Sequence, residues 1–267
     1  MIRRILNYIS HGILKKNIKF KDKHKGEECY LFGNGGSIKY FELSRFSDKI
    51  SFGCNSLHLH KNVLDLDMRY YVMMAPLEFC KYWRGVKSGI YIEKNPYYAN
   101  VHKFAKDKKC NVFTHASNYI FTKKYDNFHY VHNFKRNKLS LNTLDFSSSS
   151  SFAAGGPVAM IGLAIYMGFK KIYLVGCDYW FVPRGEGHFY SLMDYQDGGN
   201  DFIYEDLMNV ISDEVEIVVV TRNGSKSVVN YIEYSELTGV DEKKQSVVDI
   251  VSEEDLKFLA TTMYLRR

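Results

Sequence analysis

The sequence predicts an α/β fold, with a doubly wound, mostly parallel sheet in a single main domain. Two observations predict this class. Short apolar runs typical of buried strands alternate with helix-like runs, as in parallel sheets whose strands are joined by helices. The 267 residues, of which 46% are hydrophobic and 25% charged, are also enough to bury a sizeable core.

The expected elements follow one another along the chain. Strands are expected at residues 29–32, 49–53, 69–74, 111–114, 128–134, 171–176 and 215–221. Helices are expected at residues 38–46, after Pro76, at 96–108, 153–169 and 202–211, and after the loop 221–225. A glycine-rich loop follows the first strand, which makes the fold Rossmann-like. Residues 239–267 form a charged tail that we expect to be helical.

Composition excludes several classes of protein. No run of about 18 uncharged apolar residues is present, so a polytopic membrane protein is excluded. The five cysteines are odd in number and show no CxxC spacing, which argues against a disulfide framework and a zinc knuckle. No HExxH motif and no signal peptide are recognisable. We therefore expect a cytoplasmic protein without a bound metal.

The positive charge lies at one end of the chain. Residues 1–25 hold eight lysines and arginines and one acid, whereas the rest holds 28 basic and 29 acidic residues. Apolar residues fall on one helical stripe, formed by Ile2, Ile5, Leu6, Ile9 and Ile13. Residues 1–27 thus predict a basic amphipathic helix and linker. The helix either binds an anionic membrane surface or packs on its own domain. Nucleic acid is not an expected partner, because the remaining chain is not basic.

Two strand ends carry residues suited to ligand binding. The first is the loop Gly33-Asn34-Gly35-Gly36-Ser37, whose glycines let main-chain N–H groups approach a phosphate at a helix N-terminus. Alternatively, the loop is only a tight turn. The second is Asn55, directly after the second strand, which either binds a ligand or caps a helix.

A third strand end combines an acid with a histidine. Asp178 follows the strand 171–176, and His188 comes ten residues later between glycine and aromatic residues. A histidine beside the crevice suits general base catalysis, because its ordinary pKa lies near working pH; otherwise it is a surface histidine. Asp65 and Asp67 form a DxD pattern of the kind that holds a metal, but it precedes a strand, so we expect a solvated loop or helix end.

Several of these segments resemble one family in the same order along the chain. Residues 33–38 (GNGGSI) resemble the GNGPSL opening of the bacterial lipooligosaccharide sialyltransferases, glycosyltransferase family 42. Cys54-Asn55, the segment 162–180 (GLAIYMGFKKIYLVGCDYW) and the segment 215–237 are similar to later parts of that family. Residues 153–190 are also similar to the domain shared by 6-hydroxymethylpterin diphosphokinases and flagellin-modification proteins. The chain differs from the sialyltransferases at Ala75, Gly156 and Trp180.

The resemblance implies an activity and a set of site residues. It implies a GT-A-like variant of the fold, with residues 28–238 as the nucleotide-sugar-binding catalytic domain and a lid loop at about 179–200. It implies an inverting, metal-independent transfer from a CMP-activated sugar, with His188 as base and Asp178 and Tyr190 beside it. The nucleotide-binding residues that it implies are Gly33, Asn34, Gly35, Gly36, Ser37, Asn55, Gly155, Gly156, Tyr179 and Trp180.

The expected partners follow from the same resemblance. A lipopolysaccharide, O-antigen or capsule glycolipid would be the acceptor, and the basic N-terminal helix would hold the enzyme at the inner face of the bacterial cytoplasmic membrane. A homo-oligomer stays open. Two alternatives remain: a diphosphokinase-like enzyme that needs ATP and Mg²⁺, and a non-catalytic scaffold of polysaccharide assembly. Strict dependence on a metal would favour the diphosphokinase over the transferase. A His188→Ala variant that keeps its function in cells would favour the scaffold.

Overall fold

The computed structural model describes residues 11–79, 83–84, 91–92, 96–132, 141, 144–148, 155–178, 187–191, 211, 214–227 and 229–261. The chain divides into two compact units. Unit 1 comprises residues 1–27 and 69–170, and unit 2 comprises residues 28–68 and 171–267. The predicted mostly parallel α/β fold is confirmed, since the main strands of each unit pair in parallel.

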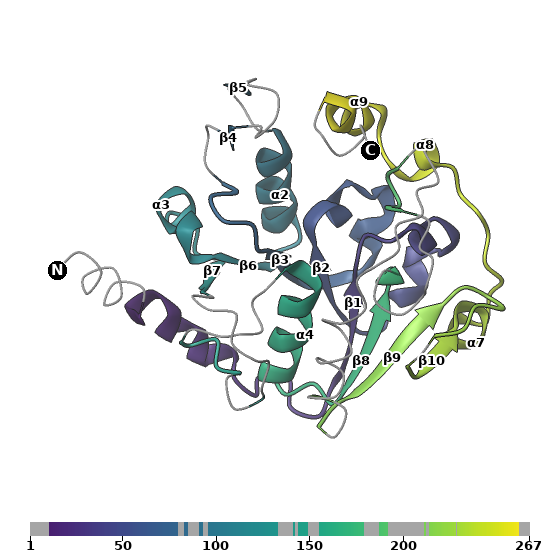
Figure 1. Ribbon diagram of the computed structural model, residues 1–267, viewed down its shortest axis with the longest axis horizontal. Coiled ribbons are helices and arrows are strands. Elements are labelled where there is room, and N and C mark those ends of the chain that lie inside the picture. Colours follow the sequence, from purple (N-terminus) through teal and green to yellow (C-terminus); the bar gives the residue numbers. More distant parts are fainter. Residues whose placement is uncertain are drawn as a thin grey trace. The chain divides into compact units, whose positions relative to one another are not determined.

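Unit 2 holds five parallel strands in the order β10-β9-β8-β1-β2 (Figure 1). Their bounds are β1 Glu28–Phe32, β2 Ile50–Cys54, β8 Lys171–Val175, β9 Glu216–Thr221 and β10 Tyr231–Glu233. Leu31 of β1 pairs with Phe52 on one side and Leu174 on the other, and all three are at most 1% exposed. Strands covered on both faces read as continuous apolar runs, which is why these segments could be recognised. Burying each such side chain contributes about 1.5–3 kcal/mol.

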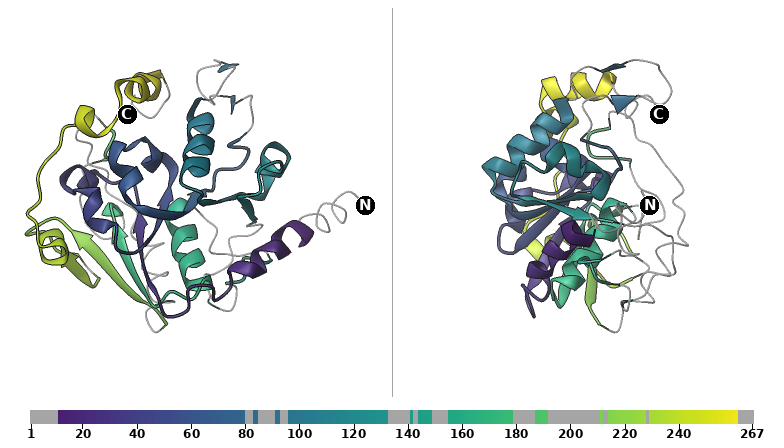
Figure 2. Two further views of the ribbon diagram at one scale, coloured as in Figure 1. Left: turned by 180° about the vertical axis from the view of Figure 1, so that it is seen from behind. Right: turned by 90° about the vertical axis from the view of Figure 1, so that its left-hand side faces the viewer.

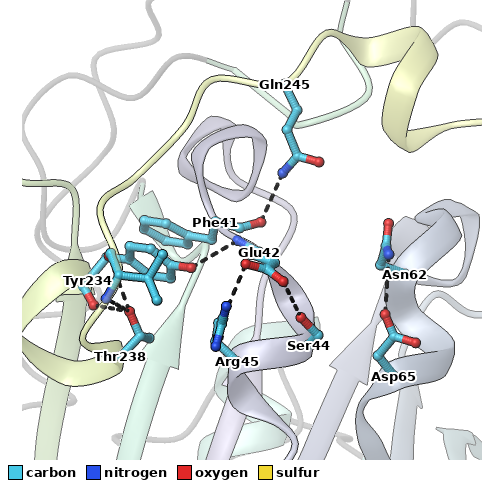
Figure 3. Close-up of polar contacts among 10 residues, drawn as sticks. Phe41, Glu42, Ser44, Arg45, Asn62, Asp65, Tyr234, Thr238 and Gln245 are labelled. Atoms are coloured by element: carbon cyan, nitrogen blue, oxygen red, sulfur yellow. Dashed lines mark hydrogen bonds and ion pairs between the residues drawn. The ribbon is translucent and has the colours of Figure 1, made fainter.

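The helix expected at residues 38–46 is wrong in type. The chain instead forms two 3₁₀ helices, η2 (Gly36–Tyr40) and η3 (Leu43–Phe46), separated by extended backbone at Phe41 and Glu42. The Phe41 ring stacks on Tyr234 at 4.8 Å, and the Glu42 main-chain N–H donates to the Tyr234 hydroxyl at 3.2 Å (Figure 3). These tertiary contacts outweigh the local preference for a continuous helix.

The C-terminal part of unit 2 contains short helices and an extended stretch. The helices are α7 (Tyr234–Thr238), α8 (Val247–Ile250) and α9 (Glu253–Thr261), so the helical tail is interrupted and the strand β10 before α7 was not expected. Gln245 donates its main-chain N–H to the carbonyl of Lys39 at 2.8 Å and its amide to the carbonyl of Phe41 at 3.1 Å (Figure 3). These contacts fasten the tail to the C-terminal end of η2.

Unit 1 holds three parallel strands in the order β3-β6-β7. Their bounds are β3 Asp67–Met73, β6 Asn111–His115 and β7 Phe128–Val131; the helices are η1 Lys15–Phe20, α2 Pro96–Asp107, η6 Ala116–Asn118, α3 Tyr119–Thr122 and α4 Gly156–Tyr166, and β4 Trp83–Arg84 pairs antiparallel with β5 Tyr91–Ile92. The helix η1 is part of the purple segment near the N-terminus in Figure 2. Its Asn17 donates to the carbonyls of Tyr130 and Phe146 at 2.7 and 2.8 Å. Since β7 is the last strand of this group, η1 protects its outer edge.

The N-terminal helix expected from the stripe Ile2–Ile13 lies mostly outside the described residues. The described part begins as helix at residue 11 and continues as η1. Leu14, Asn17 and Phe20 are buried there, with Lys15, Lys16, Ile18 and Lys19 exposed between them. This three-residue spacing is that of a 3₁₀ helix with one buried face. In the part of the chain that the structure describes, no helix has the length and apolar character needed to span a membrane.

Buried histidines should make the fold sensitive to acid. His60 in unit 2 is 1% exposed and His129 in unit 1 is 6% exposed, and burial lowers their pKa to about 4 and about 3. An unfolded histidine has a pKa of about 6.5. Between these values the unfolded chain binds protons that the folded chain does not, so the free energy of unfolding falls as the pH falls.

We expect each of these two histidines to remove about 2 kcal/mol of stability at pH 5 relative to pH 7.5. Urea unfolding at a series of pH values measures the effect. The variant His129→Gln should show a shallower pH dependence, whereas the variant of the exposed His11, His11→Gln, should match the wild type. Equal wild-type stability at pH 7.5 and pH 5 would contradict the prediction.

Candidate functional site

The loop Gly33–Ser37 lies at the carboxyl ends of three neighbouring strands of unit 2, β8, β1 and β2. Gly33 donates its N–H to the carbonyl of Val175 at 2.8 Å, and Gly35 donates to the carbonyl of Gly176 at 2.7 Å. A Cβ atom on Gly35 would lie 2.5 Å from the Asp178 carboxyl group. Glycine is therefore required here for close approach of two chain segments, which is one of its usual uses.

Asp178 fastens the far end of this loop. Its Oδ2 accepts the main-chain N–H of Ser37 at 2.7 Å and its Oδ1 accepts the Ser37 hydroxyl at 2.5 Å. Hydrogen bonds to a charged group are the strong ones, worth about 1.5–3 kcal/mol each. The carboxylate also takes the position at the start of η2 that an anion would occupy. Its catalytic role stays a prediction.

These contacts limit how the loop binds a phosphate. The N–H groups of Gly33, Gly35 and Ser37 already donate within the protein, and the buried Asp178 charge would repel a second anion beside it. The phosphate-binding role of residues 33–37, Gly36 included, stays a prediction. The loop's arrangement favours contacts with a neutral part of a ligand.

Asn34 offers such a contact. Its side chain is 8% exposed, and its Nδ2 donates to the main-chain carbonyl of Cys54 at 3.0 Å. Its Oδ1 is buried without a hydrogen-bond partner. Buried polar atoms are almost always paired, so an unpaired one inside a candidate site indicates a place for a donor from a ligand. The binding role of Asn34 stays a prediction.

His188 lies directly beside Asn34. Its Nδ1 donates to the main-chain carbonyl oxygen of Asn34 at 3.2 Å, and His188 forms an antiparallel bridge with Gly35. Burial lowers the pKa of His188, and the hydrogen bond to Asn34 partly opposes that shift. The imidazole is therefore neutral at pH 7, which is the form that accepts a proton.

Aromatic residues hold this imidazole in place. The Tyr190 ring stacks on His188 with ring centroids 5.0 Å apart, and Phe189 packs edge-on against Tyr190 at 5.1 Å. Both aromatic side chains are at most 2% exposed. His188 is thus held by a stacked ring and a main-chain carbonyl, and its role as a base stays a prediction.

Asn55 begins the 3₁₀ helix η4 (Asn55–Leu59) at the end of β2. Its φ is +49°, a conformation that asparagine tolerates better than most residues. Its carbonyl accepts a hydrogen bond from His58 Nδ1 at 3.0 Å, and its side chain is exposed. Asn55 and Asn34 therefore border neighbouring strand ends, as the sequence predicted.

The other expected site residues belong to unit 1 or fall outside the described residues. Gly155 precedes α4 in unit 1 with φ +78° and ψ 161°, a region open essentially to glycine alone, and Gly156 is the first residue of that helix. Tyr179, Trp180 and most of the expected lid at 179–200 lie outside the described residues. Their roles stay predictions.

Two residues of the site were not expected from the sequence. Gly176 has φ +65° and accepts the Gly35 N–H, and the main-chain N–H of Phe189 donates to the Asn34 carbonyl at 3.0 Å. The glycine directly after the strand 171–175 was the available signal for the first. Main-chain contacts such as that of Phe189 leave no pattern in the residue types.

The predicted DxD pattern lies between a helix end and a strand start, since Asp67 is the first residue of β3. Asp65 ends the 3₁₀ helix η5 (Lys61–Asp65), is exposed and accepts the amide of Asn62 at 3.2 Å, so it is a solvated helix end (Figure 3). Among the described residues, no group of three or more His, Cys, Asp or Glu side chains is placed to hold a metal ion.

Fold and site together define an α/β protein with a candidate binding site at the carboxyl ends of the parallel strands of unit 2. No protein-family model and no curated protein matches the chain. Among solved structures, it is similar to the sialyltransferase CstII from Campylobacter jejuni, crystallised with cytidine-5'-monophosphate, with 15% identity, 90% of this chain and 99% of that chain covered and a TM-score of 0.47.

Two further solved structures are of the same kind. The monofunctional α-2,3-sialyltransferase Cst-I from Campylobacter jejuni is 14% identical over 88% of this chain and 92% of that chain, with a TM-score of 0.49. CST-II in complex with a trisaccharide acceptor and CMP is 16% identical over 89% and 100%, with a TM-score of 0.47. These proteins are sialyltransferases, the class that the motifs of residues 29–237 resemble. At these scores, the function proposed for this chain rests on its own residues.

Proposed function

We propose that the chain is a glycosyltransferase that transfers a sugar from a CMP-activated donor to a glycan acceptor, with inversion and without a metal. The observation that carries the proposal is the contact between a base and a binding loop. The neutral His188 ring donates a hydrogen bond to the main-chain carbonyl of Asn34, and the buried side-chain Oδ1 of Asn34 has no hydrogen-bond partner. The motif resemblance of the same residues supports the same activity.

The proposed chemistry is a single displacement. The acceptor hydroxyl oxygen forms a bond to the anomeric carbon, and the bond from that carbon to the phosphate oxygen of CMP breaks, with the electron pair staying on the phosphate. The hydroxyl proton passes to His188. Because burial keeps His188 neutral, it is ready to accept that proton at neutral pH. The Tyr190 ring stacks on the imidazole, and Tyr179 or Tyr190 is the candidate donor to the leaving phosphate.

In this proposal the donor nucleotide binds at the strand ends of unit 2. Asn34 accepts a hydrogen bond from the nucleotide, and Gly35, Gly36 and Asn55 border it, while Asp178 keeps the loop in shape through Ser37. Gly155, Gly156, Tyr179 and Trp180 are further nucleotide-binding candidates. The similarity of residues 153–190 to diphosphokinase-type domains stays a prediction. It implies an enzyme that binds ATP and Mg²⁺ in place of a CMP-activated sugar.

The proposed acceptor is a lipopolysaccharide, O-antigen or capsule glycolipid, reached from the cytoplasm at the inner face of the membrane. The exposed Lys15, Lys16 and Lys19 support an anionic lipid surface as partner, since each lysine near such a surface adds about 1 kcal/mol. The expected homo-oligomer stays a prediction.

A thermal-shift screen of CMP, CDP, UDP, GDP and ATP, each with EDTA and with Mg²⁺, tests the donor. CMP at about 100 times its Kd should stabilise the fold by about 2.7 kcal/mol. The shift should persist in EDTA and should be lost in the variant Asn34→Ala, while the variant of an exposed asparagine, Asn62→Ala, should keep it. A shift with ATP and Mg²⁺ alone would contradict the proposal and favour the diphosphokinase.

A further inference from the structure

Two functional segments of unit 2 meet at one residue, Asn34. The main-chain carbonyl of Asn34 accepts hydrogen bonds from His188 Nδ1 at 3.2 Å and from the N–H of Phe189 at 3.0 Å. The next residue, Gly35, forms the antiparallel bridge with His188. The segment that carries the proposed base is thus anchored to the main chain of the glycine loop.

This anchoring determines where the His188 proton lies. A carbonyl oxygen only accepts hydrogen bonds, so Nδ1 at 3.2 Å from it must be the protonated nitrogen. With the proton on Nδ1, the lone pair of the neutral ring is on Nε2. The other tautomer would place two lone pairs against each other at this distance. The carbonyl of Asn34 therefore selects Nε2 as the basic atom.

The side chain of Asn34 makes contacts different from those of its main chain. Its Nδ2 is used by the carbonyl of Cys54 at 3.0 Å, which fixes the orientation of the amide. That orientation leaves the buried Oδ1 without a partner. A buried acceptor of this kind is satisfied when a ligand brings a donor to it.

We propose that Asn34 is a positioning residue that joins the two halves of the site: its main-chain carbonyl fixes the tautomer of His188, and its amide oxygen receives a donor group of the nucleotide. The second half rests on the proposed function, whereas the first half does not. The base is held in its reactive tautomer before any ligand arrives.

Nuclear magnetic resonance of the ring nitrogens tests the tautomer in the full chain. The protein is labelled with ¹⁵N-histidine, and the His188 signals are assigned by comparison with His188→Gln. The free protein at pH 7.5 should show a protonated Nδ1 and an unprotonated Nε2 for His188. A protonated Nε2, or an even mixture of tautomers, would overturn the positioning role. This readout needs neither activity nor a ligand.

Titration with CMP tests the second half. The His188 ring signals should move when CMP is added to the wild type and to the control variant Asn62→Ala. In Asn34→Ala the carbonyl remains and the amide oxygen is lost, so the tautomer should stay while the response to CMP disappears. A CMP response equal to that of the wild type would overturn this half. If CMP fails to bind the wild type, the proposed function fails, and the tautomer of the free protein still decides the role of the carbonyl.

Discussion

Replacing Gly33 with alanine is expected to destabilise the protein by about 3–5 kcal/mol, which is at the high end for a single substitution. A Cβ atom at this position would collide with the main-chain carbonyl of Gly176 and lie 3.0 Å from the Cys177 sulfur. Main chain cannot rotate away as a side chain does. The substitution must therefore separate β1 from the loop after β8, with loss of the hydrogen bond from Gly33 to Val175.

Urea unfolding of Gly33→Ala against the wild type measures this effect. Gly12→Ala is the matched control, because nothing lies within 4 Å of a Cβ at Gly12 and the residue is helical. There alanine should leave stability unchanged or raise it by up to about 1 kcal/mol. A Gly33→Ala chain without a cooperative transition agrees with the prediction, whereas a loss below about 1 kcal/mol would show that the two segments separate easily.

The strands could be predicted because their physical cause is local. In a sheet buried on both faces a strand reads as an apolar run, and β1, β8 and β9 each have one of four residues. In β2 the buried Ser51 interrupts the run. The prediction of one helix at residues 38–46 was wrong because the conformation there depends on Tyr234, almost 200 residues away. The strand β10 was not predicted because its three residues are partly exposed and form no apolar run.

The site divides in the same way. The position of the glycine loop, Asn55 and Asp178 at neighbouring strand ends could be predicted, because parallel strands place their carboxyl ends together. His188 could be recognised by its residue type and neighbouring glycine. The pairing of Asp178 with Ser37 could not, since a carboxylate beside a glycine loop looks like a ligand or metal group until its two partners are seen. The contact of His188 with Asn34 runs through main chain, which the residue types do not encode.

Replacing His188 with alanine is expected to lower the rate of sugar transfer by about 10²–10⁴-fold, the usual contribution of a general base. The loss should appear in kcat, while the thermal shift produced by CMP should stay that of the wild type, because Asn34 and the glycine loop remain in place. Release of CMP from a panel of CMP-activated sugars, with glycan acceptors present, measures the rate. The variant His11→Ala, at an exposed histidine, is the matched control and should leave the rate unchanged.

The pH dependence of kcat/KM gives a second test of His188 as the base. Burial lowers the pKa of His188 below the ordinary 6.5, so the wild-type ring is neutral at pH 7 and active. As the pH falls through that lowered pKa the ring becomes protonated, and kcat/KM should then fall about tenfold for each pH unit. The residual activity of His188→Ala should lack this acid limb, because the group that titrates is gone. A variant that keeps the wild-type rate, or keeps the acid limb, would assign the proton to another residue and leave His188 as a structural part of the loop.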